Sequence, residues 1–114
     1  MNDLKVVIDA GHGGNDPGAS GNGIIEKDLT LAISEYMYDL LKNMGVNVKM
    51  TRISDETISP TERVNRILEA FGNNKDVIVV SNHINAGGEK GFCGKLTFFE
   101  KICKIVKKMS KIML

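Results

Sequence analysis

The chain has 114 residues, which is enough for one domain with its own hydrophobic core and too short for several domains. Apolar residues make up 42% of it and charged residues 25%, the ordinary balance of a globular domain, and no apolar run approaches the roughly 20 residues of a membrane span. The net charge of +1, the mildly acidic composition of residues 1–90 and an aromatic content of 5% argue against a nucleic-acid-binding domain.

The first half of the chain predicts a strand, a long loop, a helix and a second strand. An apolar run predicts a strand at residues 4–9, and a glycine-rich loop follows over residues 11–25. A helix is expected over residues 28–44, where Gly45 is a natural end. Residues 46–51 alternate polar and apolar side chains, which predicts a half-exposed strand beside the central one. The apolar positions at helical spacing are Leu29, Ile33, Met37, Leu40, Leu41 and Met44.

The second half predicts another helix and a third strand. Ser59 is expected to be the helix N-cap, with Pro60 at the first helical position and Glu62 at the third, as in a capping box. This helix is expected to run to about Phe71, and residues 76–82 form the third predicted strand. The βαβαβ order predicts a three-layer α/β fold, in which a twisted, mostly parallel sheet is flanked by helices.

Two histidines follow the first and third predicted strands, and they are the only histidines in the chain. His12 lies in the glycine-rich loop, and His83 comes directly after residues 76–82. The carboxyl ends of parallel strands meet at one edge of a sheet, so the two imidazoles are placed to meet there. Glu26 stands where the loop returns to that edge to begin the helix. Two histidines and one carboxylate form the ligand set of a catalytic zinc ion that keeps a fourth position open.

Simpler explanations exist for each of these residues. His12 could be incidental to a turn, Glu26 could serve the helix dipole, and His83 could be satisfied by neighbouring polar groups. A phosphate cradle in the glycine-rich loop is a weak alternative, because no Gly-Lys-Ser/Thr ending and no adjoining helix follow it. Three polar side chains are candidates to fix the imidazole tautomers, although the first could also cap the local turn: Asp9, Asn82 and Asn85.

Several segments together resemble the zinc-dependent N-acetylmuramoyl-L-alanine amidases of the amidase-3 type. The resemblance covers residues 4 to about 91. It implies an incomplete version of that family's α/β fold, with Zn²⁺ held by His12, Glu26 and His83. It also implies peptidoglycan as substrate, cleaved at the amide between the lactyl group of N-acetylmuramic acid and L-alanine. The matching segments are Ile8-Asp9-Ala10-Gly11-His12-Gly13-Gly14, Asp16-Pro17-Gly18-Ala19, Glu26-Lys27-Asp28-Leu29, Thr51-Arg52, Asp55, Arg63 and Ser81-Asn82-His83-Ile84-Asn85-Ala86.

The resemblance ends where the family's remaining strands and its late catalytic glutamate are expected. Cys93 stands where the first expected glutamate would be, and no segment matches the late one. Glu89 and Glu100 do not lie in the motif, so the catalytic residue is left unassigned. Two functions therefore stay open: a peptidoglycan hydrolase, or a truncated, catalytically impaired remnant that binds zinc or peptidoglycan. A phosphate-binding regulatory domain is a distant third.

The C-terminal segment differs from the rest of the chain. Residues 1–91 form the predicted amidase-like core, and residues 92–114 form a basic amphipathic segment with six lysines and one glutamate. Packing of a helix against the exposed sheet is the favoured interpretation of this segment, and contact with an anionic membrane is a less favoured one. A frameshift near residue 92 is a third hypothesis.

The beginning of the chain carries no signal-peptide pattern. Residues 1–5 run directly into the first predicted strand. We therefore expect synthesis in the cytoplasm, and action on the cell wall after release, as for a phage-type lysin or a fragment of a longer gene.

Overall fold

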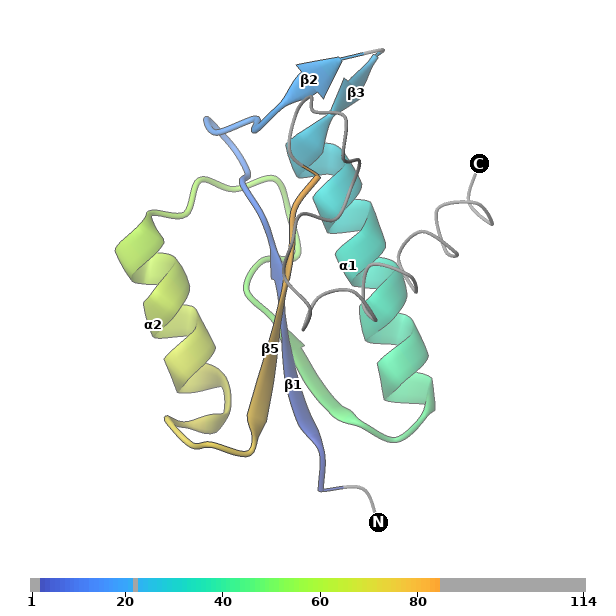
Figure 1. Cartoon of the computed structure of the whole chain (residues 1–114), viewed down its shortest axis with the longest axis vertical. Coiled ribbons are helices and arrows are strands. Elements are labelled where there is room, and N and C mark those ends of the chain that lie inside the picture. The colour runs from blue at the N-terminus through green and yellow to red at the C-terminus, as the bar shows by residue number, and fades with distance from the viewer. Residues whose placement is uncertain (1–2, 22, 85–114) are drawn as a thin grey trace.

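The computed structural model describes residues 3–21 and 23–84 (Figure 1). Its main sheet contains β1 (Lys5–Ala10), β4 (Asn47–Met50) and β5 (Val77–Asn82) in the order β4-β1-β5. Both pairings are parallel, so β1 is the central strand and β4 is its half-exposed neighbour, as predicted.

Two helices cover the two faces of this sheet. Figure 1 shows α1 (Glu26–Asn43) on one face and α2 (Pro60–Phe71) on the other, which confirms the three-layer α/β fold. The core lies mainly between α1 and the sheet. Leu40 and Met44, at the C-terminal end of α1, remain 44% and 64% exposed. The buried apolar side chains of the core are Val6, Ile8, Ile33, Met37, Val46, Val48 and Val80.

A small hairpin interrupts the loop predicted over residues 11–25. Its strands are β2 (Ser20–Gly21) and β3 (Ile24–Ile25), which pair antiparallel just before α1. The helix begins at Glu26, two residues before the predicted start, because neighbouring loop carbonyls satisfy its first N–H groups. The N–H of Glu26 donates to the carbonyl of Ala19 (2.8 Å), and that of Lys27 donates to the carbonyl of Pro17 (3.0 Å). Because these partners are backbone carbonyls and not a capping side chain, the sequence carries no signal for the earlier start.

The start of α2 agrees with the predicted N-cap. The Ser59 hydroxyl accepts a hydrogen bond from the N–H of Glu62 at 3.1 Å, and Pro60 occupies the first turn. The Glu62 carboxylate pairs with Arg66. No residue of α2 is fully buried, and Val64 is 53% exposed, so apolar packing alone does not attach this helix to the sheet.

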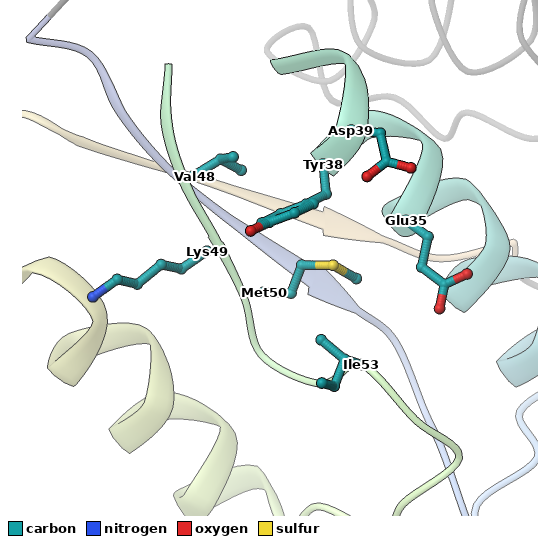
Figure 2. Close-up of a pocket in the computed structure, with 7 residues that line it drawn as sticks. All are labelled: Glu35, Tyr38, Asp39, Val48, Lys49, Met50 and Ile53. Carbon is teal, nitrogen blue, oxygen red and sulfur yellow. The ribbon is translucent and has the colours of Figure 1, made fainter. Parts of the chain in front are cut away.

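An open pocket of about 590 Å³ lies between α1 and the edge strand β4 (Figure 2). Its walls combine carboxylates of α1 with apolar side chains of β4 and the loop after it. None of its lining residues is a predicted ligand: they are Glu35, Tyr38, Asp39, Val48, Lys49, Met50 and Ile53.

Within the described residues, neither helix is both long and apolar enough to cross a bilayer. The predicted boundary at residue 91 and the segment 92–114 lie outside the described residues.

Candidate metal centre

The ends of β1 and β5 approach so closely that only glycine fits between them. The N–H of Gly11 donates to the carbonyl of Asn82 at 3.0 Å. A Cβ added to Gly11 would lie 2.6 Å from that carbonyl oxygen and 2.6 Å from the ring of His83. The next residue, His12, has a φ of 64°, an uncommon conformation for a residue with a side chain. This backbone turn carries the imidazole out of the sheet.

Glu26 is brought to the same edge by the return of the loop to the start of α1. Its side chain is buried, with 3% of its surface exposed. One carboxylate oxygen, Oε1, accepts from the N–H of Ala19 at 2.9 Å, and the other, Oε2, accepts from the N–H of Ile84 at 2.9 Å. Two backbone groups from different segments therefore fix the orientation of this carboxylate.

The three candidate ligands meet, as the sequence predicted. His12 Nε2 lies 3.0 Å from Glu26 Oε2 and 3.2 Å from His83 Nδ1. His83 Nδ1 lies 3.5 Å from Glu26 Oε2. In the described part of the chain, these residues form a group that could hold one metal ion.

The spacing of the three ligand atoms suits a tetrahedral divalent ion. Zinc lies about 2.0–2.2 Å from nitrogen and oxygen ligands, which places neighbouring ligands of a tetrahedron roughly 3.3 Å apart. The separations of 3.0, 3.2 and 3.5 Å lie close to that value. The side chains of His12 and His83 are 23% and 41% exposed, whereas Glu26 is buried, so the imidazole side of the group is accessible to solvent.

Asp9 does not contact either imidazole, so its predicted role in fixing a tautomer is wrong. Its side chain points to the α2 face of the sheet, where it accepts hydrogen bonds from Thr51, Ser81 and Arg63. Burial by itself would raise the pKa of Asp9, but the hydrogen bonds from Ser81, Arg63 and Thr51 lower it below the ordinary value. Asp9 therefore ties three segments together beneath the site.

Asn82 does not contact an imidazole either. Its amide donates to the hydroxyl of Ser34 at 2.9 Å and lies 3.4 Å from the sulfur of Met37, which joins β5 to α1. Because side chains alternate across a strand, Asn82 faces α1 while the chain turns only at the next residue. Asn85, the third candidate, lies outside the described residues.

Two arginines support the loop that carries His12, and the sequence assigned them no role. Arg63, from α2, donates to the carbonyls of Ala10 (2.8 Å) and His12 (2.9 Å). Arg52 is only 2% exposed, and its guanidinium donates to the carbonyls of Gly11 (3.0 Å) and Lys27 (2.9 Å) among others. Both arginines lie in segments that resemble the amidases, but that resemblance gave no indication of their contacts.

Asp16 contacts the far side of the His12 ring, another contact missed from the sequence. Its Oδ2 lies 2.8 Å from His12 Nδ1, and its Oδ1 accepts from the N–H of Gly18 at 3.1 Å. The hydrogen bond with His12, followed by that from Gly18, lowers the pKa of Asp16. A second aspartate, Asp55, accepts from the N–H of Gly14 and from the amino group of Lys27.

Comparison with known proteins identifies the family of this fold and site. The family pattern of N-acetylmuramoyl-L-alanine amidases of the amidase-3 type matches residues 6–113. The chain belongs to this family. The match includes part of the predicted C-terminal segment as well as the α/β core.

Two similar proteins are longer than this chain. The sporulation-specific N-acetylmuramoyl-L-alanine amidase of Bacillus subtilis (strain 168) is 43% identical over 91 residues, which cover 78% of this chain and 34% of the relative. The endolysin of Bacillus phage SPP1 is 44% identical over 89 residues, covering 76% of this chain and 31% of the endolysin. The chain thus spans about a third of each of these two relatives.

The fold of this chain is similar to that of a solved amidase structure. N-acetylmuramoyl-L-alanine amidase AmiC2 of Nostoc punctiforme superposes with a TM-score of 0.65 at 34% identity, covering 78% of this chain and 48% of that one. The three-layer core is therefore an amidase fold that is incomplete relative to the full domain.

Proposed function

We propose that this chain contributes the zinc site of a peptidoglycan hydrolase. The reaction is hydrolysis of the amide between the lactyl group of N-acetylmuramic acid and L-alanine, with Zn²⁺ held by His12, Glu26 and His83. The observation that carries the proposal is the meeting of these three ligand atoms at 3.0–3.5 Å in a chain that belongs to an amidase family.

The donor set suits this chemistry. A zinc ion bound by two neutral imidazoles and one carboxylate keeps a net positive charge, lowers the pKa of a water toward about 7 and polarises a carbonyl group. The chain supplies the anionic ligand Glu26 in a fixed orientation, because backbone N–H groups hold both of its oxygens. The exposed imidazole side of the group is the side from which a glycan strand can approach.

The second candidate is a truncated chain that binds zinc or peptidoglycan without efficient turnover. It is favoured by the departure from the family pattern after residue 91, where Cys93 stands in place of the first expected glutamate and the catalytic carboxylate is left unassigned. A general acid or base contributes about 10²–10⁴-fold to the rate, so a chain without one would retain the site and lose most of the activity. Both candidates include synthesis in the cytoplasm and release to the cell wall.

Metal content tests the site itself. Elemental analysis of the wild type is expected to find about one zinc per chain, because the three ligands share one ion. Glu26→Ala is expected to lose the ion, since it removes the anionic ligand. Glu35→Ala, which removes an exposed carboxylate further along the same helix, is the matched control and should keep the ion. Equal zinc in the wild type and in Glu26→Ala would contradict the assignment.

Activity separates the two candidates. The zinc-loaded chain is incubated with purified peptidoglycan, and newly freed L-alanine amino termini are measured. Release above that of Glu26→Ala supports the hydrolase. No release, together with a melting temperature that a chelator still lowers, supports the binding remnant.

A further inference from the structure

We propose that Asp16 is the positioning residue for the metal site, holding His12 in the tautomer that leaves Nε2 free to bind an ion. This inference deepens the proposed function and rests on it for the zinc readout, whereas its tautomer readout is independent of any metal. The juxtaposition that carries it is the Asp16 carboxylate on one side of the His12 ring, with Glu26 and His83 on the other side.

The two nitrogens of His12 face different surroundings. Nδ1 lies 2.8 Å from Asp16 Oδ2, while Nε2 lies 3.0 Å from Glu26 Oε2 and 3.2 Å from His83 Nδ1. An ionised carboxylate only accepts hydrogen bonds, and the ring has one on each side, Asp16 at Nδ1 and Glu26 at Nε2. A ligand nitrogen must be free of its proton, so when Nε2 and Glu26 bind an ion the proton of the ring is held at Nδ1, where Asp16 accepts it. The neutral ring then presents its lone pair at Nε2, directed at the other two ligands.

Asp16 is itself held in place. Its backbone exchanges hydrogen bonds with Gly13, N–H to carbonyl in both directions, at 2.8 and 3.0 Å. Its Oδ1 accepts from the N–H of Gly18 at 3.1 Å, which leaves Oδ2 for His12. The carboxylate is therefore fixed by its own turn before it meets the imidazole.

A purely structural role for Asp16 would use only one of its oxygens. The bond from Gly18 to Oδ1 is an ordinary side-chain turn, and Asn could make it equally well. The bond to His12 uses the other oxygen and requires an acceptor there. The two roles are therefore separable by a single substitution.

Within the described residues, the other two ligands are held differently. Backbone N–H groups orient Glu26. For His83, the contacts in the described residues involve Nδ1, the atom that faces the site. Among the described contacts, Asp16 is thus the carboxylate that holds a ligand ring from outside the group of three.

Asp16→Asn is the deciding variant. It keeps an oxygen for Gly18 and replaces Oδ2 by an amide that donates, which favours the proton on Nε2 of His12. Long-range ¹H–¹⁵N NMR at alkaline pH of metal-free Glu26→Ala, which lacks the carboxylate that competes at Nε2, should find the Nδ1–H tautomer, and adding Asp16→Asn should shift it toward Nε2–H. Zinc affinity, measured by competition with a chromophoric chelator, should fall about 10–100-fold. The melting temperature of the metal-free variant should stay close to that of the wild type.

Asp55→Asn is the matched control. Asp55 is also exposed and also divides its two oxygens between a backbone N–H and a side chain, but it contacts no candidate ligand. It should leave both the His12 tautomer and the zinc affinity unchanged.

The outcomes distinguish this inference from the proposed function. Metal-free Glu26→Ala with the proton of His12 on Nε2 overturns the inference, even if Asp16→Asn does not fold. Unchanged zinc affinity in Asp16→Asn also overturns it while leaving the zinc site intact. A wild-type chain that binds no zinc overturns the proposed function, and the tautomer measurement still decides the role of Asp16.

Discussion

At the scale of single residues, the site depends on a backbone conformation that histidine rarely adopts. The left-handed φ of His12 is of the kind that costs about 1–3 kcal/mol and persists only where surrounding contacts enforce it. Arg63 provides such a contact, because one guanidinium holds the carbonyls of Ala10 and His12 and also pairs with Asp9. Planar, multi-donor geometry makes arginine suited to this task.

Arg63→Lys should therefore lower the free energy of unfolding by about 1–3 kcal/mol, because a single ammonium cannot reproduce the hydrogen bonds of the guanidinium to Asp9 and to the carbonyls of Ala10 and His12. Urea unfolding of the metal-free chain measures it. Arg66→Lys is the control on the same helix. Arg66 pairs with the more exposed Glu56 and Glu62, so its replacement should cost less than about 1 kcal/mol. Equal losses in the two variants would contradict a special role for Arg63.

At the scale of elements, short connections rather than long apolar runs place the ligands. The hairpin β2–β3 and the carbonyls of Pro17 and Ala19 determine where α1 begins, and hence where Glu26 lies. The helix α2 contributes through its polar side chains, since no residue of it is fully buried. Its start depends on a side-chain cap that the sequence already indicates.

Ser59→Ala should destabilise the chain by about 1 kcal/mol, because it removes the acceptor for the N–H of Glu62. Thermal or urea unfolding measures this loss. Ser59→Asp retains an acceptor at the N-cap and should stay near wild-type stability. If both substitutions cost the same, the loss would come from something other than the cap.

At the scale of the whole molecule, charge pairing makes the fold sensitive to acid. The pKa of Asp9 is lowered by hydrogen bonds that outweigh burial, and those of Asp16, Asp55 and Glu56 are lowered mainly by hydrogen bonds from their partners. A carboxyl group with a lowered folded-state pKa binds protons less readily when folded than when unfolded. Its contribution is therefore complete above the unfolded pKa and is lost as the pH falls through the folded one.

The free energy of unfolding of the metal-free chain should thus decrease as the pH falls below about 4.5, near the ordinary pKa of a glutamate. Urea unfolding at several pH values from 7 down to 3 checks this. Asp9→Asn should show a shallower decrease, because Asp9 is the most buried of the four groups. Stability that is constant or rises on acidification would contradict the pairing described here.

The sequence alone determined much of the fold and the candidate ligands. Apolar periodicity predicted the two main helices and the parallel strands, because burial of one face imposes a regular spacing on each element. It also placed His12 and His83 at one edge, since parallel strands end together there. Glu26 followed from the return of the loop to that edge.

Tertiary structure decided the contacts that have no periodic signal. The four paired residues of β2–β3 are too few to produce a strand pattern, and the early start of α1 depends on carbonyls from the preceding loop. Asp16, rather than Asp9, is the partner of His12, and the left-handed backbone at residue 12 lies between the strand that carries Asp9 and the loop that carries Asp16. Spacing along a strand predicts which residues share a face, whereas the direction of a side chain in a turn is set by the segments packed around it.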